Sequence, residues 1–177
     1  IMALSKNISM DELMNQLPQV GEVTWIGLRP ERRATLTSVQ EAEISTESGL
    51  IGDHFKGVRS TKRQVTLIQA EHLDAVGSML GQGSVDPGLT RRNIVVRGIN
   101  LLAMKDKQFQ IGEVVLEMTG LCHPCSRMEE NLGPGGYNAM RGHGGITARV
   151  IKGGKVKVGD AVIKIGEAQK SESGQTT

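Results

Sequence analysis

The sequence predicts a mainly β domain, arranged as a barrel or a sandwich, and two observations support this. Apolar residues alternate with polar ones through much of the chain, which is the two-residue period of a β-strand. Turn-forming residues interrupt these stretches often, and glycine accounts for 23 of the 177 residues, about twice its average share of roughly 7%. Many short strands separated by turns favour a barrel or a sandwich over a wound α/β sheet.

A short helix is expected near the start of the chain, followed mainly by strands. Ser9 and Glu12 form a capping-box pattern, and apolar residues at helical spacing continue it as far as Pro18. Val23 and Trp25 then begin an alternating pattern, with both side chains expected on one face. Further helices are expected at 70–80 and 124–132, and further strands at 35–45, 63–68, 93–97, 108–111, 114–118, 146–152, 156–158 and 162–165.

One domain is expected at 21–165, preceded by an extension at 1–20 that carries the first helix. The tail at 166–177 contains almost no apolar residues and is expected to be disordered. No stretch reaches the roughly 18 apolar residues of a membrane-spanning helix, and no signal-type segment opens the sequence. We therefore expect no membrane association.

Composition further narrows the classes of partner. Lys and Arg number 21 against 19 for Asp and Glu, a net charge of +2, whereas nucleic-acid-binding domains are usually strongly basic. No nucleic-acid partner is therefore expected. Two cysteines in 177 residues do not form a disulfide scaffold, so a cytoplasmic location is expected.

Cys122 and Cys125 form a C-x-x-C pair, the most distinctive local feature of the chain. Redox chemistry at such a pair needs a thioredoxin-like context that the strand pattern does not suggest, and a zinc site needs two further ligands. A single activated thiolate fits Cys125 best. Pro124 favours a helix start there, where the helix dipole and Arg127 would lower the pKa of the thiol below roughly 8.5. The alternative is that both cysteines are inert core residues.

Arginines next to turns and glycines indicate an anionic ligand. These are the pair Arg91-Arg92, Arg127 and Arg141, and guanidinium groups suit bidentate binding of phosphate or carboxylate. The Gly- and Pro-rich stretch 133–145, interpreted as a loop, would add backbone N–H groups. Exposed arginines without a ligand and a purely structural loop are the alternatives.

Asp53 and His54 follow Gly49 and Gly52, which permit backbone conformations that are unfavourable for other residues. Their side chains would project from a tight loop, although a turn closed by an aspartate side chain needs the same residues. His72, by contrast, lies in the predicted helix at 70–80 and is interpreted as structural or exposed.

Five segments in a fixed order carry a family resemblance that extends from about residue 35 to 165. They are Gly49-Leu-Ile-Gly-Asp53-His54, Arg92-Asn-Ile-Val-Val-Arg-Gly98, Pro124-Cys125, Gly142-His-Gly-Gly-Ile-Thr-Ala-Arg149 and Gly159-Asp160. In this order they resemble the MOSC domain, the module at the C-terminus of molybdenum-cofactor sulfurases, and in particular its stand-alone bacterial members.

The resemblance implies a mainly β fold, a closed β-barrel of MOSC type with a few short peripheral α-helices. It also implies that the molybdenum cofactor (molybdopterin) binds at a pocket where Cys125 is both the catalytic residue and the metal ligand. The cofactor-binding residues expected around it are Asp53, His54, Arg92, Asn93, Arg127, Arg141 and His143. No sulfurase domain that binds pyridoxal phosphate is recognised, so no pyridoxal phosphate is expected on this chain itself. A sulfur-donor enzyme or a reductase is then an expected partner.

Two chemistries at Cys125 follow from the resemblance. The thiolate could carry sulfur as a persulfide, or it could ligate molybdenum for the reduction of N-hydroxylated substrates, and both need a deprotonated sulfur. Two rivals stay open at this point. One is a non-catalytic barrel that binds an anionic ligand or a partner, and the other is a dithiol oxidoreductase that needs both cysteines.

Overall fold

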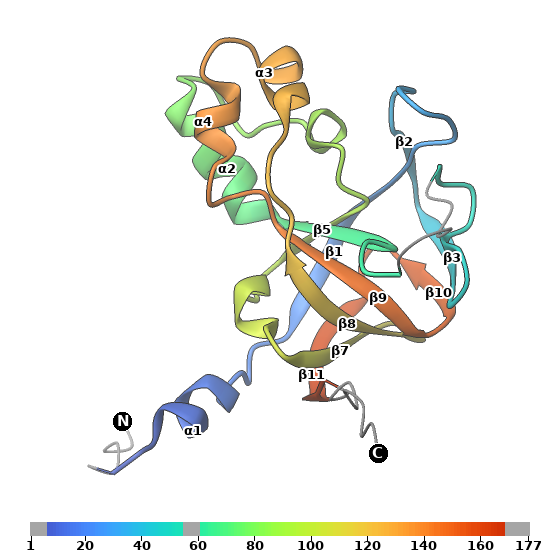
Figure 1. Ribbon diagram of the computed structural model, residues 1–177, viewed down its shortest axis with the longest axis vertical. Helices are drawn as coiled ribbons and strands as arrows, with labels where there is room; N and C mark the ends of the chain where they lie inside the picture. Colours follow the sequence, from blue (N-terminus) through green and yellow to red (C-terminus); the bar gives the residue numbers. More distant parts are fainter. Residues whose placement is uncertain (1–6, 55–60, 169–177) are drawn as a thin grey trace, which may run out of the picture.

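The computed structural model describes residues 7–54 and 61–168, and its centre is a β-barrel. The strands of the barrel are β1 (Gly21–Leu28), β5 (Val65–Gln69), β6 (Ile94–Arg97), β7 (Lys107–Ile111), β8 (Val114–Leu121), β9 (Ile146–Lys152) and β11 (Ala161–Glu167). They are paired in the order β1-β6-β5-β9-β8-β7-β11, and the barrel closes because β11 also pairs with β1. Every pair is antiparallel except β5–β6. The closed, mainly β barrel is thus confirmed (Figure 1).

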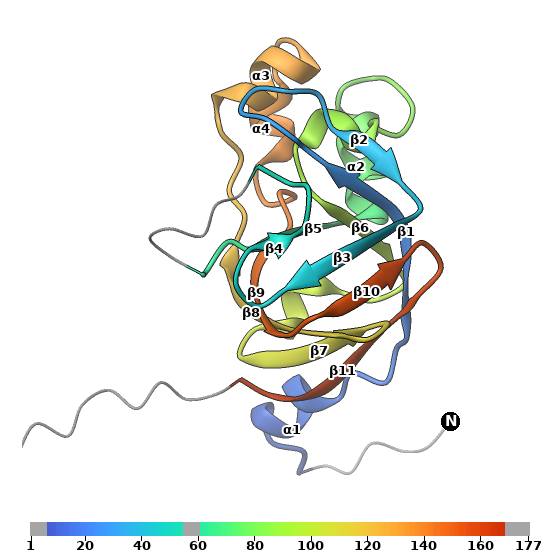
Figure 2. The same ribbon diagram turned by 90° about the vertical axis from the view of Figure 1, so that its right-hand side faces the viewer.

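Four shorter strands flank the barrel in the described part of the chain. They are β2 (Thr37–Val39), β3 (Glu41–Ser45), β4 (Gly49–Leu50) and β10 (Gly154–Lys157). Strand β2 pairs with β1, while β10, β3 and β4 form a separate small sheet, which lies beside the barrel in Figure 2. The strand expected at 35–45 is therefore two strands, and most other predicted strands differ by only a few residues at their ends.

Short helices lie at the two ends of the barrel. They are α1 (Met10–Asn15), α2 (Ala70–Met79), α3 (Ser126–Leu132) and α4 (Gly136–Met140), with 3-10 turns η1 (Pro87–Thr90) and η2 (Leu101–Met104). Helices α2, α3 and α4 gather at one end, and α1 lies at the other (Figure 1). Among the described residues, no helix is long and apolar enough to cross a membrane.

Two hydrophobic clusters hold these layers together. The larger one fills the barrel and includes Phe109, the only fully buried aromatic residue among those described, so aliphatic side chains and Met supply the rest. The smaller one packs the helices against the outside of β5 and β6; its buried members are Ile68, Leu73, Val76, Val85, Val95, Met128, Ala139 and Met140. Because Met128 belongs to α3, this second cluster fixes the position of the helix that follows Cys125.

The first strand corrects one prediction. A β-bulge between Val23 and Trp25 shifts the alternation, so that Val23 and Ile26 face the barrel core while Trp25 packs against the second cluster. A bulge inserts one residue and moves the following side chains to the opposite face. The two side chains expected on one face therefore lie on different faces.

The first helix has its predicted capping box, but its apolar side chains do not pack into the core. The Ser9 hydroxyl accepts a hydrogen bond from the Glu12 amide, and the Glu12 carboxylate accepts one from the Ser9 amide. Its apolar side chains stay on the surface, with Met10 at 68% exposure and Met14 at 55%. The helix therefore contributes no buried residue to the core.

Two further boundaries differ from the sequence interpretation. The stretch 133–145, interpreted as a loop, contains α4, and the helix expected from Pro124 begins at Ser126. Strand β11 extends to Glu167, two residues into the expected tail, and 169–177 lie outside the described residues. The same is true of residues 1–6 of the expected N-terminal extension.

Candidate functional site

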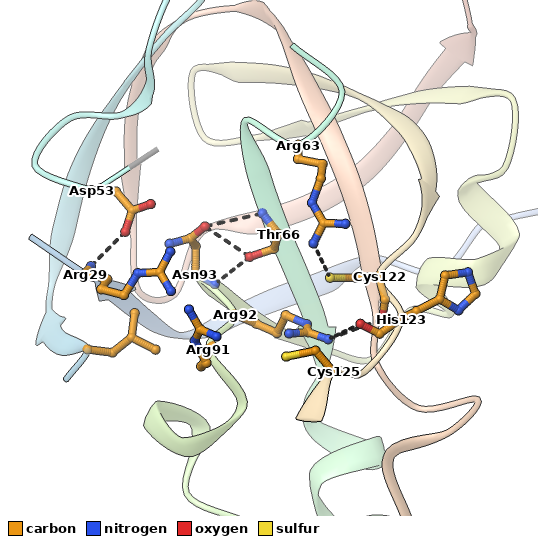
Figure 3. Close-up of a pocket in the computed structure, with 11 residues that line it drawn as sticks. Arg29, Asp53, Arg63, Thr66, Arg91, Arg92, Asn93, Cys122, His123 and Cys125 are labelled. Atoms are coloured by element: carbon orange, nitrogen blue, oxygen red, sulfur yellow. Dashed lines mark hydrogen bonds between the residues drawn. The ribbon is translucent and has the colours of Figure 1, made fainter. Parts of the chain in front are cut away.

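A pocket of about 220 Å³ lies where six segments of the chain meet. These are the end of β1, the residue before β2, the turn after β4, the start of β5, the turn before β6, and the segment between β8 and α3. Its lining residues are Arg29, Leu36, Asp53, Arg63, Thr66, Arg91, Arg92, Asn93, Cys122, His123 and Cys125. We call it the Cys125 pocket, and Figure 3 shows its side chains.

Positive charge dominates the lining of the Cys125 pocket. It has four arginines, whereas Asp53 is the only acidic residue among the described lining residues. Mutual repulsion of several guanidinium groups is unfavourable unless an anion binds between them. The pocket is therefore suited to an anionic ligand.

Burial and neighbouring charges in the Cys125 pocket affect the Arg29 side chain. Burial, and then the neighbouring charge of Arg91, hold the pKa of Arg29 below its usual value, and Asp53 partly offsets them. The Asp53 carboxylate accepts a hydrogen bond of 2.7 Å from the Arg29 backbone amide, not from its guanidinium. The buried Nε of Arg29 has no hydrogen-bond partner among the described residues. A buried, unpaired donor beside a pocket favours a ligand that accepts its hydrogen bond.

Arg92 is buried and mainly holds neighbouring backbone segments together through hydrogen bonds, which we call the Arg92 clamp. Its guanidinium donates to the backbone carbonyls of Gly144 (2.8 Å) and Thr90 (2.9 Å), and more weakly to those of Cys122 (3.3 Å) and His123 (3.4 Å). Burial lowers its pKa, and the two nearby cysteines act in the opposite direction. Most of its N–H groups are thus used within the protein.

The clamp holds the segment that contains both cysteines. The Cys122 amide donates to the Gly145 carbonyl at 2.8 Å, so this segment is tied to the glycine-rich turn before β9. A Cβ at position 144 would overlap the Cys122 carbonyl oxygen, and only glycine therefore allows the two backbones to approach this closely. The predicted Gly-rich segment before β9 thus supports the site through packing.

The side chain of Asn93 also forms its hydrogen bonds within the protein. Its Oδ1 accepts hydrogen bonds from the Thr66 hydroxyl (3.1 Å) and amide (3.4 Å), and its Nδ2 donates to the Gly27 carbonyl (3.2 Å). These contacts link β1, β5 and the start of β6 beneath the pocket. Asn93 lines the site, but its side-chain amide mainly connects the strands that form it.

The two cysteines differ in access. Cys125 is exposed and immediately precedes α3, where its side chain makes no capping hydrogen bond. Cys122 is 2% exposed, as its place at the end of an apolar strand suggests. Its Sγ nevertheless lines the pocket and accepts a 3.6 Å hydrogen bond from Arg63, so it is more than a core residue.

Four of the expected cofactor-binding residues are not among the described residues that line this pocket: His54, Arg127, Arg141 and His143. Arg127 pairs with Glu130 at 3.0 Å and lines a neighbouring pocket instead. The ring of His143 packs edge-on against His72, with centroids 5.1 Å apart. Asp53, Arg92, Asn93 and Cys125 are brought together as expected.

The stretch at 133–145, expected to direct N–H groups at an anion, already has an anionic partner within the chain. The Glu129 carboxylate accepts hydrogen bonds from the amides of Gly135 (2.8 Å) and Tyr137 (2.9 Å) at the start of α4. These bonds hold the pKa of Glu129 below its usual value. The hypothesis that this stretch cradles a ligand is not supported by these two amides.

Sequence reasoning left several pocket residues out of the predicted site: Arg29, Arg63, Thr66, Cys122 and His123. Arg91, which was singled out with Arg92 as a candidate for binding an anion, does line the pocket, and Arg63 was recognisable from its place at a predicted strand start. Nothing local marks Arg29, because it becomes a neighbour of Arg91 only when β1 and β6 pair.

The described residues contain no group of three or more His, Cys, Asp or Glu side chains able to hold a metal ion. The Cys125 pocket would offer a metal one exposed cysteine sulfur, and a second sulfur from Cys122 that already accepts a hydrogen bond from Arg63. These donors suit a metal that arrives with an organic group supplying its other ligands.

The fold and the pocket together define a closed, mixed β-barrel that presents an exposed thiol beside clustered arginines. The chain belongs to the MOSC domain family, since residues 50–163 match that family. No curated protein matches the sequence.

Solved structures of bacterial proteins share the fold. YuaD from Bacillus subtilis is 15% identical with a TM-score of 0.73, over 87% of this chain and 100% of that one. YiiM from Geobacillus stearothermophilus is 15% identical with a TM-score of 0.65, over 82% of this chain and 75% of that one. YiiM from Escherichia coli is 17% identical with a TM-score of 0.64, over 84% of this chain and 71% of that one.

Proposed function

We propose that this chain binds the molybdenum cofactor in the Cys125 pocket and that the thiolate of Cys125 acts on sulfur or on the metal. One observation carries the proposal: an exposed cysteine shares a pocket with two arginines, Arg29 and Arg91, that keep hydrogen-bond donors unused by the described residues. The Arg29 Nε is buried without a hydrogen bond, and the Arg91 guanidinium makes none with another described residue. Such donors are suited to a phosphate beside a soft metal ligand.

The residues present fit this cofactor. Arg29, Arg63 and Arg91 would bind the phosphate of the pterin, and Cys125 would supply the protein's thiolate to the metal. When bound, the cofactor supplies a redox-active metal held by its own dithiolene sulfurs. The pocket, at about 220 Å³, is smaller than the roughly 300–1,000 Å³ of typical ligand sites. It would enclose one end of the ligand and leave the remainder beside the neighbouring surface.

As a sulfur carrier, Cys125 would act by exchange at sulfur. Its thiolate attacks the outer sulfur of a donor persulfide, the donor leaves as a thiolate, and Cys125 holds the transferred sulfur as a persulfide. A nucleophilic acceptor then removes that sulfur, and the Cys125 thiolate is restored, so no external oxidant or reductant is used. The exposure of Cys125 gives a donor protein access to it.

As a metal ligand, Cys125 would instead remain bound during turnover. Its location just before α3, which the second hydrophobic cluster holds in place, fixes the backbone that carries the sulfur. Arg92 fixes the preceding residues through the Cys122 and His123 carbonyls. Activity would then be the reduction of an N-hydroxylated substrate, with electrons delivered by a partner reductase.

A dithiol oxidoreductase is a second candidate, because Cys122 lines the same pocket as Cys125. This chemistry needs both sulfurs, since one thiolate attacks and the other resolves the mixed disulfide. The Arg63 guanidinium also donates a 3.6 Å hydrogen bond to the Cys122 sulfur.

Matched serine variants separate these functions. The protein and its Cys125→Ser and Cys122→Ser variants are purified from a host that makes the molybdenum cofactor. Molybdenum, pterin and bound persulfide are then measured. We expect Cys125→Ser to lose the persulfide or the metal, and Cys122→Ser to retain it. Equal loss in both variants, together with a reversible two-hydrogen mass change on mild oxidation of the unmodified protein, would favour the dithiol function instead.

A further inference from the structure

A second basic pocket adjoins the Cys125 pocket. It has a volume of about 140 Å³ and is lined by Arg33, Ala34, Thr35, Leu36, Gly88, Leu89, Arg91, Arg127 and Asn131. We call it the Arg33 pocket. Leu36 and Arg91 line both pockets, so the two are contiguous.

The Arg33 pocket has three arginines and no acidic residue among its described lining residues. Neither Arg33 nor Arg91 forms a hydrogen bond or an ion pair with another described residue, which leaves both guanidinium groups free to bind a ligand. Arg127 is paired with Glu130, but the Glu130 side chain is 58% exposed. Exposed pairs of this kind are weak, so Arg127 can exchange Glu130 for a stronger anion.

The backbone gives an independent indication of function at this place. In the described chain, the non-glycine residues with positive φ are Arg33 (67°), Arg91 (61°) and Asp106 (58°). Two of the three are arginines that line the Arg33 pocket. Arginine is unfavourable in the left-handed region, and such conformations are concentrated at ligand-binding sites.

The pocket also has a stable frame. The Asn131 side chain on α3 donates a 2.9 Å hydrogen bond to the Leu89 carbonyl in η1, which joins two of the segments that line it. Arg127 and Asn131 lie on one helix, while Arg91 immediately follows η1. Ligand-binding groups are thus presented by elements that are already held together.

We propose that the Arg33 pocket is a second oxyanion subsite, which binds a phosphate or carboxylate of a ligand whose other end lies in the Cys125 pocket. This inference rests on the proposed function and extends it, because the Cys125 pocket alone encloses only part of a ligand. The second anion belongs either to an extended, diphosphate form of the cofactor or to an acceptor substrate. Both sources offer the same chemistry to Arg33, Arg91 and Arg127.

Calorimetric titration of the full chain, without cofactor, tests the subsite with inorganic tripolyphosphate. The test variant is Arg33→Gln, which keeps an unbranched side chain at the same backbone position, and Arg127→Gln is the second. The control is Lys152→Gln, which makes the same change in net charge at an exposed residue outside both pockets. Glu130→Gln releases Arg127 from its ion pair.

We expect about tenfold weaker binding in Arg33→Gln and Arg127→Gln, which corresponds to about 1.4 kcal/mol. Binding should change less than twofold in Lys152→Gln and should be tighter in Glu130→Gln. The subsite is refuted if Arg33→Gln and Arg127→Gln bind tripolyphosphate no more weakly than Lys152→Gln does. Because this titration uses cofactor-free protein, its outcome is independent of whether the chain carries molybdenum.

Titration of cofactor-loaded protein with orthophosphate distinguishes the two sources of the anion. Binding that still depends on Arg33 shows an open subsite, available to an acceptor substrate. Loss of that binding on loading, together with less pterin retained by Arg33→Gln, assigns the subsite to the cofactor. Either result supports the subsite, whereas orthophosphate binding and pterin retention that are both insensitive to Arg33 contradict it.

Discussion

Replacing Arg92 with methionine should lower the stability of the fold, because the Arg92 guanidinium bonds mainly to backbone carbonyls and not to a ligand. The two short hydrogen bonds, to Gly144 and Thr90 at 2.8 and 2.9 Å, are worth about 1.5–3 kcal/mol each for a charged donor. Two longer bonds to the cysteine segment add less. Methionine avoids the cost of burying a charge, which offsets part of the loss. We therefore expect Arg92→Met to lower the free energy of unfolding by about 3 kcal/mol.

Urea denaturation measures this loss, with Arg97→Met as the control. Arg97 ends β6, the strand that follows Arg92, but its side chain is 60% exposed and pairs with Glu22 among the described residues, so its loss should cost at most about 1 kcal/mol. Iodoacetamide should also label Cys122 faster in Arg92→Met, since the carbonyls that hold this segment lose their donor. If Arg92→Met is as stable as Arg97→Met and only cofactor retention falls, Arg92 is a ligand-binding residue and the clamp is refuted.

Three further predictions concern the cysteines and two titrating groups. Between about pH 6 and 9, iodoacetamide should label exposed Cys125 faster than Cys122, which is 2% exposed; faster labelling of Cys122 would contradict the assigned roles. Burial and the adjacent His143 hold the pKa of His72 below 6.5, so the unfolded chain binds more protons and stability should fall as pH drops below 6.5. His72→Gln should flatten that fall, and an unchanged pH profile would refute it. At pH values above 4.5, the usual glutamate pKa, Glu129→Gln should lower the melting temperature, and at lower pH the effect should become smaller. The reason is that Glu129, whose pKa is depressed, stabilises the fold only while it is ionised. An effect that does not depend on pH would contradict this.

The barrel was predictable because its signal is local and repeated. Alternating burial in β7, where Lys107, Phe109 and Ile111 face inward, follows directly from the period of a strand. The bulge in β1 was not predictable in this way, since an inserted residue leaves the same composition and only shifts the face of Trp25. Helix α4 was missed because its start depends on the Glu129 carboxylate, which lies in the preceding helix.

The site could be predicted only where the type of a residue and its neighbours in the sequence already indicated its role. A position next to a helix start was predicted for Cys125, and the structure places it there with an exposed side chain. Arg92 was expected to bind phosphate because its residue type suits that role, yet burial commits most of its donors to backbone carbonyls. Arg29 and Arg33 come from one region of the chain and Arg91 from another, and the pairing of β1 with β6 brings these regions together.

The central claim is that the Cys125 pocket holds the molybdenum cofactor, and metal and pterin analysis of the native protein tests it most directly. The full chain is purified without chelators from a host that makes the cofactor. Molybdenum is measured by mass spectrometry, and pterin by its fluorescence after oxidation. We predict that both are present in equal amounts and that Arg29→Gln and Arg91→Gln lower both, whereas Lys152→Gln does not. Protein that is fully folded but carries neither molybdenum nor pterin would contradict the claim.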